Sequence, residues 1–531
     1  MKRPMPRPLG ALCVLAVCAL LAACGGGGGG GCFFTYPDGP PDLRDGPDPL
    51  LGQQWHLQNT GQNGGTVGED VRALLAWLLQ PSKGESVRVA IVDDAIETVH
   101  EDLAPNLAAW FDYRPGAAAG SAPLPCEETD DHGTKVAGIV LARDGNAAGG
   151  AGVAPRARLG AYNPLSTNTN ADIANALGQD SAVTGVYNNS WGSPDDGLLH
   201  AAEASYVNAI RAGIEEGRDG KGSVYVFPAG NGGCFMVGSQ GCAYDDNANF
   251  DGYVNQFGVN AICAVDDLGK APFYAEPGAN VLVCGPSGNS GRPAITTTAP
   301  GNGYADVSGT SASTPMVSGV VALMLQERPD LTWRDVRLIL AHSARQNDSA
   351  DAGWVTSAAL PGLPFNPKYG FGVADAEQAV LLARNWDSVG GSASLQRCDV
   401  TRGPGAPFPL AVPDGDAAGR IDQVEVDASR CAINQIEFVE VRFSATHDFS
   451  GDLRIELTSP SGLVSVLASE RLCDADGDGL ADDCGAYNGW TFGSVRHLDE
   501  PSQGTWALRV ADRIGGDAGQ WNSWSLTLWG R

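Results

Sequence analysis

Short apolar runs alternate with helical segments from about residue 55 to residue 383, and this alternation restricts the fold more than any other feature of the chain. The runs VRVAIVD, VYVFPAG, NAICAV and ANVLVC have the length and the β-branched content of buried strands. Helical stretches lie between such runs and after them, among them SASTPMVSGVVALMLQE. Because strands separated by helices build parallel sheets, the pattern predicts an α/β domain over residues 46–388, with a parallel sheet covered by helices.

The pattern changes near Gly390, where helical periodicity fades and turn residues become frequent. Runs such as QIEFVEVRFSA, DLRIELTSPSG, TWALRVAD and SWSLTLWG alternate apolar and polar residues. A period of two is typical of strands that turn one face toward a core. We therefore expect a second, all-β domain over residues 395–531, built as a sandwich.

The first 45 residues predict that the protein is exported and that it carries a site for lipid attachment. Lys2, Arg3 and Arg7 form a basic start, an apolar run follows, and the sequence LAAC ends at Cys24. This order is typical of a signal peptide, here over residues 1–23, and LAAC resembles the bacterial lipoprotein processing box. The apolar run is shorter than the roughly 20 residues that span a membrane, which disfavours a transmembrane anchor.

We expect Cys24 to carry the lipid and residues 24–45, which are rich in Gly and Pro, to form a tether. The expected location is extracytoplasmic, as a bacterial lipoprotein of the outer membrane or cell surface. Secretion after cleavage at a nearby small residue is the alternative.

The net charge limits the classes of partner, and the number of cysteines indicates the cellular compartment. The chain has 62 acidic and 34 basic residues, a formal net charge of -28, which repels phosphate backbones and disfavours nucleic acid. The same surplus suits calcium or positively charged substrates. Ten of the 13 cysteines remain once Cys13, Cys18 and Cys24 are set aside, an even number that fits disulfides. Spacing suggests the pairs Cys234–Cys242, Cys263–Cys284 and Cys473–Cys484, although sequence leaves the connectivity open.

Three segments place reactive side chains at the ends of predicted elements. In VRVAIVDD, Asp93 follows a buried strand and should lie at the carboxyl edge of the sheet, where active sites of parallel sheets collect. In DDHGTKVAGIVLA, His132 begins a helix. In SGTSASTPMVSGVVALML, Ser311 begins another, where backbone amides and the helix dipole favour developing negative charge.

These residue types form a set that can activate a nucleophile. Serine needs a base to take its proton, and the base needs a carboxylate that fixes its tautomer and stabilises the imidazolium. Asp93, His132 and Ser311 would supply the three groups. Asn231, in the turn FPAGNGG after another apolar strand, would donate its amide to the oxyanion of a tetrahedral intermediate.

At these residues the chain resembles the subtilisin family of serine proteases, whose three motifs occur here as VDD, HGT and GTSASTP in the order Asp, His, Ser. The segments QQWHL, VDDAIETVHEDL, NNSWGSPDDG, DNANFDGYVN and FYAEPGA resemble the kexin-like branch, the proprotein convertases. The resemblance implies a serine endopeptidase that acts on protein or peptide substrates. A calcium-dependent surface binding or adhesion protein on an inactive protease scaffold is the alternative.

In that branch acidic side chains form pockets for arginine or lysine, and Asp94, Asp195 and Asp251 occupy the matching positions. Buried carboxylates favour a guanidinium that pairs with them through two hydrogen bonds. The stretch NPLSTNTNADIANALG and the segment GLLHAA are largely neutral where convertases carry further acids. We therefore expect cleavage after Arg or Lys, with a weaker preference for particular substrate residues further upstream.

The resemblance also implies two calcium sites. The first would use the side chains of Asp48, Asp102 and Asn146 and the carbonyl oxygens of Arg143, Ala148 and Gly150. The second would use Asp195, Asp246 and Glu276, close to the pocket for the basic residue. Ordinary turn chemistry explains the same residue types without a metal. The segment CDADGDGLADDC, with Asp474, Asp476, Asp478 and Asp482, is either a further calcium loop or a metal-free acidic turn closed by a disulfide.

The final domain resembles the P domain of kexin-like enzymes through SGDLRIELTSPSG, GTWALRVAD and GQWNSWSLTLWG, which implies a jelly-roll-like sandwich that stabilises its neighbour. Its tryptophans could form a carbohydrate platform, although aromatic residues at strand spacing more often fill cores and interfaces. They are Trp506, Trp521, Trp524 and Trp529.

Overall fold

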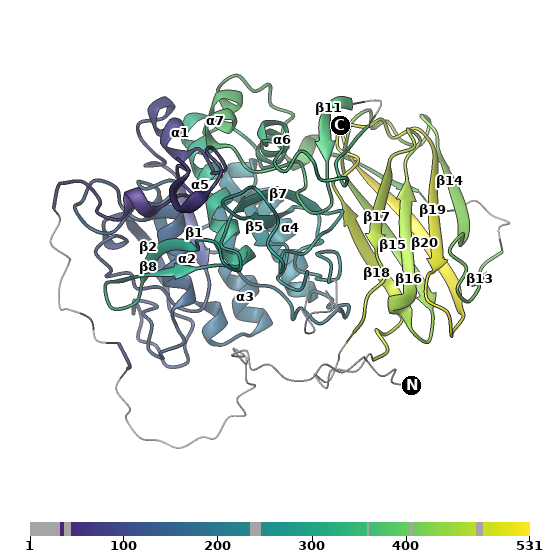
Figure 1. Cartoon of the computed structure of the whole chain (residues 1–531), viewed down its shortest axis with the longest axis horizontal. Helices are drawn as coiled ribbons and strands as arrows, with labels where there is room; N and C mark the ends of the chain where they lie inside the picture. The colour runs from purple at the N-terminus through teal and green to yellow at the C-terminus, as the bar shows by residue number, and fades with distance from the viewer. Residues whose placement is uncertain are drawn as a thin grey trace, which may run out of the picture.

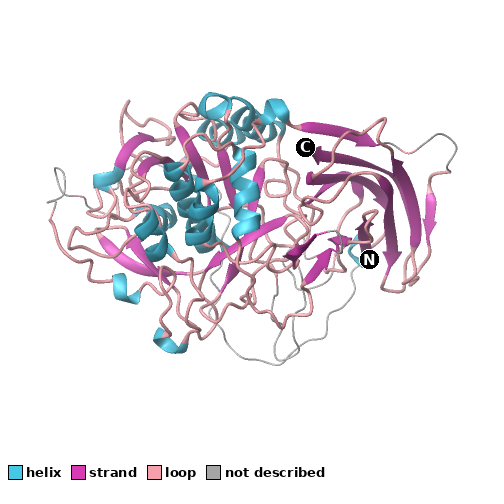
Figure 2. Cartoon of the chain, turned by 90° about the horizontal axis from the view of Figure 1, so that it is seen from above, coloured by secondary structure: helices cyan, strands magenta, loops and turns pink. Residues whose placement is uncertain are grey.

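The structure is a computed structural model of the whole chain (Figure 1). It describes residues 32–34, 36, 44–233, 246–357, 360–400, 402, 407–473 and 482–531. An α/β unit that carries the helices lies beside an all-β unit, and Figure 2 shows the same division from above.

The α/β unit is built on a seven-stranded sheet in the order β2-β3-β1-β4-β5-β6-β7. Every neighbouring pair in it is parallel. The central strands are buried along almost their whole length, which explains their continuous apolar sequences. The strands are β1 (Arg88–Val92), β2 (Leu107–Phe111), β3 (Arg158–Tyr162), β4 (Thr184–Asn189), β5 (Val224–Pro228), β6 (Val259–Val265) and β7 (Val281–Pro286).

Helices cover both faces of this sheet. Successive side chains of a strand point to opposite faces, and β4 shows which helix lies on each. Asn188 accepts a hydrogen bond from Ser318 of α5, whereas Tyr187 stacks on Tyr225, whose hydroxyl lies against Gly213 of α4. The helices are α1 (Ala73–Leu79), α2 (His132–Leu141), α3 (Asn170–Ala176), α4 (Ala204–Gly220), α5 (Thr310–Glu327), α6 (Trp333–Ser343) and α7 (Ala376–Arg384).

Two short hairpins complete the α/β unit. One pairs β8 (Ile295–Ala299) with β9 (Gly303–Val307) and lies against α2, where the hydroxyl of Thr298 donates to the Thr134 carbonyl. The other pairs β10 (Val355–Ser357) with β11 (Leu360–Phe365).

The all-β unit is a sandwich of two antiparallel sheets. One sheet has the order β12-β20-β15-β18 with β13 paired to β20, and the other has the order β14-β19-β16-β17. Alternate residues of β16 and β19 are buried between the sheets, as the period of two predicts. The strands are β12 (Gln396–Val400), β13 (Leu410–Val412), β14 (Arg420–Val426), β15 (Ile436–Thr446), β16 (Leu453–Thr458), β17 (Val464–Ala468), β18 (Tyr487–Ser494), β19 (Gly504–Asp512) and β20 (Gly519–Gly530).

The tryptophans of the sandwich are core and interface residues, so the carbohydrate platform considered from the sequence is wrong for them. Trp506 and Trp521 are fully buried and Trp524 is 5% exposed. Trp529 stacks on Phe257 of the α/β unit, with ring centroids 4.2 Å apart. Three of the four rings are thus closed off from solvent and Phe257 occupies one face of the fourth, so the four indole rings do not form an open platform for a sugar.

The two units share a closely packed interface. Arg334 of α6 and Glu437 of β15 form a bidentate ion pair, with Nε–Oε2 at 2.9 Å and Nη2–Oε1 at 2.5 Å. Both side chains are almost completely buried. The side chain of Asn249 exchanges two hydrogen bonds with the backbone of Gly493. Because these groups are buried, each would be left without a charge or hydrogen-bond partner if the units moved apart. We therefore expect the units to hold one fixed orientation.

Four disulfides lie in the described residues. Cys263–Cys284 joins neighbouring strands β6 and β7, and Cys473–Cys484 closes a loop of the sandwich, so both predicted pairs are confirmed. Cys32–Cys126 and Cys398–Cys431 were not predicted. The predicted pair Cys234–Cys242 lies outside the described residues.

The predicted α/β domain with a parallel sheet and the all-β domain after it are both confirmed. Between them, α7 ends at Arg384 and β12 begins at Gln396, and the exact domain bounds stay predictions. The predicted signal peptide, Cys24 and most of the tether lie outside the described residues. Among the helices that are described, none combines the length and the apolar character needed to cross a bilayer.

Candidate active site

Asp93 and His132 are in direct contact at the carboxyl edge of the sheet. Asp93 follows β1, and its Oδ1 lies 2.8 Å from Nδ1 of His132, the first residue of α2. A carboxylate can only accept, so Nδ1 donates its proton to Asp93, and in the neutral imidazole Nε2 is left as an acceptor. The Asp93 side chain is buried, while that of His132 is 32% exposed. The pair therefore has the orientation that a general base requires.

Acidic neighbours set the charge of this imidazole. Burial opposes its protonation, but the Asp93 carboxylate, helped by Asp94 and Asp131, raises the pKa of His132 to about 9. A cationic imidazole is thus stabilised, which is the state that forms after a nucleophile transfers its proton.

Ser311 lies in the first turn of α5, whose N-cap Gly309 has φ +101°. Its hydroxyl donates to the carbonyl oxygen of Ser190 (3.1 Å), and the Ser190 hydroxyl donates to the Ser311 carbonyl (3.0 Å). Both His132 and Ser311 are described, and no hydrogen bond joins the Ser311 hydroxyl to the imidazole. Catalytic hydrogen bonds are often long or poorly aligned without substrate, and the Asp93–His132 contact is the one formed contact of the predicted triad among the described residues.

Ser190 and Trp191 connect the end of β1 to the start of α5. Trp191 Nε1 donates to the carbonyl of Val92, the residue before Asp93, over 2.9 Å. Its neighbour Ser190 makes the two hydrogen bonds to Ser311. Two consecutive residues after β4 thus bring Asp93 and Ser311 to one place. Sequence reasoning missed this role, although the position of Ser190 directly after a buried strand was a usable signal.

Asn231 is oriented by the residue that precedes Ser311. Its Oδ1 accepts from the backbone N–H of Thr310 (2.9 Å) and from the Thr310 hydroxyl (3.0 Å). Because a backbone N–H can only donate, this end of the amide is the oxygen, and Nδ2 is its remaining donor group. The predicted oxyanion donor is therefore fixed beside the predicted nucleophile.

Asp94 caps helix α2. Its carboxylate accepts from the backbone N–H groups of Ala95, His132 and Gly133, at 2.5, 3.1 and 2.7 Å. Burial, and then the charge of Asp93, raise the pKa of Asp94 to about 7. The structure thus shows Asp94 holding the first turn of α2, and its substrate-binding role stays a prediction.

A pocket of about 530 Å³ opens beside Trp191. Asp251 lies behind its wall, where its carboxylate accepts from the backbone N–H and the hydroxyl of Ser193 at 2.8 and 2.9 Å. Burial raises the pKa of Asp251. The lining is mostly apolar or neutral, as the uncharged stretches of sequence suggested. It consists of Leu165, Asn168, Ile173, Trp191, Gly192, Ser193, Pro194, Leu199, His200, Ala201 and Tyr253.

Asp195, Asp246 and Glu276 lie next to one another beneath this region. The side chain of Asp195 is hydrogen-bonded to Glu276, and Glu276 also accepts from the N–H of Gly232 over 2.8 Å. Burial, followed by the charges of Asp246 and Asp195, raises the pKa of Glu276. Burial also raises the pKa of Asp246 to about 6. Three crowded carboxylates would be relieved by a cation.

The residues of the other expected calcium site also converge. Asn146 donates its amide to Asp102 over 2.7 Å, and Asp48 accepts from the backbone N–H groups of Gly145 and Asn146. Burial, together with the charges of Glu101 and Asp48, raises the pKa of Asp102 to about 6. The backbone of Arg143 is tied to Asp102, and the loop then continues through Ala148 and Gly150.

The donor chemistry of both groups fits calcium, since all donors are carboxylate, amide or carbonyl oxygens. Among the residues that the structure describes, however, no group of three or more His, Cys, Asp and Glu side chains has the arrangement of a metal site. The ligand roles of these residues therefore stay predictions. Asp474, Asp476 and Asp478 of the third acidic loop lie outside the described residues.

The loop before His132 is tied to the amino-terminal segment, which sequence reasoning also missed. Cys126 forms the disulfide with Cys32 and accepts a backbone hydrogen bond from Phe33 (2.7 Å). The hydroxyl of Tyr36 donates to the Pro125 carbonyl (2.8 Å). Contacts between segments this far apart leave no local pattern in a sequence.

A parallel sheet with Asp, His and Ser side chains at its carboxyl edge, in that chain order, defines the class of subtilisin-like α/β proteins. Comparison with protein families agrees: residues 84–372 match the subtilase family and residues 436–528 match the proprotein convertase P-domain. The chain belongs to the subtilase family, in the branch of serine endopeptidases that carries this P-domain.

Named relatives place it beside the kexin-like enzymes. It is 36% identical to the dibasic-processing endoprotease of Schizosaccharomyces pombe, over 91% of this chain and 65% of the relative. It is 33% identical to human proprotein convertase subtilisin/kexin type 7, over 91% of this chain and 60% of the relative. The chain thus spans less than two thirds of the length of these two relatives.

A solved structure shares both units. The serine protease of Aeromonas sobria, crystallised with the chaperone ORF2, has a TM-score of 0.78 and 27% identity, covering 92% of this chain and 96% of its own.

The charge of His132 provides a direct test of the site's electrostatics. An ordinary histidine has a pKa near 6.5, whereas NMR titration of the His132 ring should show a pKa of about 9, because nearby carboxylates stabilise the cation. Asp94→Asn removes one of those charges and keeps an acceptor for the Gly133 N–H, so the pKa of His132 should fall. Glu85→Gln, an exposed change before β1, should leave it unaltered. A His132 pKa that does not respond to Asp94→Asn would contradict this account.

Proposed function

We propose that the chain is an extracytoplasmic, calcium-stabilised serine endopeptidase that forms an acyl-enzyme on Ser311. The observation that carries the proposal is the 2.8 Å contact between Asp93 and His132. It orients the imidazole so that Nε2 of the neutral ring is the acceptor, in a fold that also brings Ser311 and Asn231 to the same edge of the sheet. Family membership and the names of the relatives support the same activity.

In this mechanism His132 Nε2 takes the Ser311 proton while Oγ attacks the carbonyl carbon of the scissile bond. Asn231 Nδ2 donates to the oxyanion that forms. The imidazolium, stabilised by Asp93, then gives its proton to the leaving amine, and the acyl-enzyme remains. Water repeats the sequence with His132 as its base, which releases the carboxylic acid and restores the serine.

The acidic residues around the pocket support a preference for Arg or Lys before the scissile bond. Asp251 lies behind Gly192 and Ser193, and Asp195 lies in the adjacent turn. A relative that is named a dibasic-processing endoprotease supports this choice. The apolar lining by Leu165, Ile173 and Ala201 supports looser demands at upstream positions.

Calcium would be held by two sets of residues. Asp48, Asp102 and Asn146, with carbonyls of the 143–150 loop, would form one site, and Asp195, Asp246 and Glu276 the other. When bound, the ion would neutralise carboxylates that now raise one another's pKa. An extracytoplasmic location is supported by the signal-like start, the LAAC sequence and the disulfides.

Removal of the nucleophile tests the activity. Ser311→Ala should lower kcat for peptide hydrolysis by roughly 10⁶-fold, because no other group in the site can form the acyl-enzyme. A fluorophosphonate probe should label the wild type and Ser290→Ala, an exposed control, but not Ser311→Ala. Undiminished hydrolysis by purified Ser311→Ala would reject the proposal. A wild type that neither labels nor cleaves would favour the calcium-dependent surface protein instead.

Substrate preference is tested at Asp251. Asp251→Asn keeps the side-chain shape and removes the charge, so kcat/KM for peptides with Arg before the scissile bond should fall about tenfold or more. Hydrolysis of the matching Leu peptides should change little. Asp180→Asn, before the amino end of β4, serves as the control. Equal losses for Arg and Leu peptides would remove Asp251 from substrate recognition.

Chelation tests the calcium sites. A ligand at 100 times its Kd stabilises the folded state by about 2.7 kcal/mol, so a strong chelator should lower the Tm by several degrees. Added Ca²⁺ should restore the Tm, and Mg²⁺ should not. Glu276→Gln and Asp102→Asn should each weaken the response. An unchanged melting curve in excess chelator would show that calcium does not stabilise the protein.

A further inference from the structure

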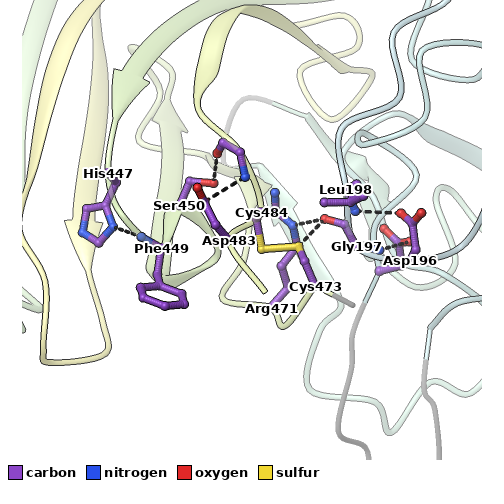
Figure 3. The surroundings of a disulfide bond; sticks show 12 residues. Asp196, Gly197, Leu198, His447, Phe449, Ser450, Arg471, Cys473, Asp483 and Cys484 are labelled. Carbon is purple, nitrogen blue, oxygen red and sulfur yellow. Dashed lines mark hydrogen bonds between the residues drawn. A yellow bond between two sulfur atoms is a disulfide. The ribbon is translucent and has the colours of Figure 1, made fainter. Parts of the chain in front are cut away.

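An arginine of the P-domain reaches into the turn that carries Asp195. Arg471 lies just before the Cys473–Cys484 disulfide, and its Nε donates to the Gly197 carbonyl over 2.5 Å (Figure 3). Its Nη1 donates to the Tyr487 hydroxyl over 2.9 Å. The guanidinium also lies over the ring of Phe250, 3.9 Å from its centroid. With only 4% of its surface exposed, Arg471 is a buried cation shared by the two units.

The backbone conformation of Gly197 and its lack of a side chain allow this close contact. Its φ is +76°, a conformation that favours glycine. A Cβ at this position would lie 2.5 Å from the Leu472 carbonyl oxygen and 3.2 Å from Cys473 Sγ. The P-domain backbone therefore packs directly on this turn. Figure 3 shows Gly197 facing Arg471 and Cys473, with Asp196 and Leu198 beside it.

The other side of the same turn contacts the buried carboxylates. The Gly197 N–H donates to Asp246 Oδ2 over 2.9 Å, so the residue that accepts from Arg471 also holds Asp246. The positive charge of Arg471 lowers the pKa of Asp246, in opposition to the larger effect of burial. One glycine thus connects the P-domain arginine to the acidic cluster.

The cluster in turn contacts the oxyanion donor. The Asp195 side chain lies against the turn that carries Asn231. The next residue, Gly232, donates to Glu276 and lies between the side chains of Asp195 and Asp246. A continuous set of contacts therefore runs from Arg471 through Gly197 and the carboxylates to Asn231.

We propose that Arg471 is a positioning residue for the active site, supplied by the P-domain, which holds the 195–197 turn so that Asp195 and Asn231 keep their places. This inference rests on the proposed peptidase function. Without Arg471 the Gly197 carbonyl loses its donor, and the turn can move away from the pocket. Arg471 touches no substrate, and its effect passes through the turn.

The test compares two buried P-domain arginines in the full-length protein. Arg496 is the matched control, because it is also buried and donates to the Phe365 carbonyl of the α/β unit, away from the 195–197 turn. Arg471→Met and Arg496→Met should both lower the Tm. Only Arg471→Met should lower kcat/KM for Arg peptides, by roughly tenfold, with a rise in KM. Arg471→Lys, which keeps a donor and the charge, should recover part of the loss.

Gly197→Ala tests the same turn from the α/β side, and it decides the question if Arg471→Met does not fold. The added methyl group collides with the Leu472 carbonyl, so this variant should show the kinetic defect at a temperature where it is folded. Kinetics of Arg471→Met that match Arg496→Met, or wild-type kinetics in Gly197→Ala, would overturn the inference. An inactive wild type would instead refute the peptidase function, so the two failures can be told apart.

Discussion

The contact between Asp93 and His132 depends on a carboxylate that is held, fully buried, at the edge of a parallel sheet. A buried charge of this kind is stable only if its surroundings supply compensating groups. Here the compensation comes from a histidine at the start of α2 and from the N–H of Asp94. The same edge receives Trp191 from just after β4, Asn231 from the turn after β5 and Ser311 from the first turn of α5. The sheet is therefore the element that lets residues from five distant segments meet.

The P-domain belongs to this arrangement, because the interface is made of groups that need partners from both units. Arg334 and Glu437 are buried together, and Phe257 is covered by Trp529. Separating the units would expose an ion pair and several aromatic rings to water at once. The orientation of the sandwich is thus fixed, and a fixed orientation allows Arg471 to act at a defined point of the catalytic unit.

The sequence allowed the sheet, the helices and the central residues to be predicted because their signals are local. Asp93, His132 and Ser311 each lie within a few residues of an element end, and apolar runs or turn glycines mark those ends. The roles of Arg471 and of the partner of Cys126 depend on which segments meet in space, whereas Ser190 directly follows a buried strand that the sequence does show. Nothing near Arg471 in the sequence distinguishes it from the other arginines of the sandwich. Its role follows from the position of Gly197, which lies 274 residues away.

The Cys32–Cys126 disulfide has a consequence for what a cut in the chain can release. Hydrolysis of any peptide bond between these cysteines would produce two fragments that a sulfur bridge still joins. The amino-terminal fragment would stay fastened to the loop that leads into α2 and would retain whatever group its own end carries. The covalent link between the two fragments would end only when the disulfide is reduced. Hydrolysis therefore decides whether the backbone is continuous, and reduction decides whether the fragments can separate.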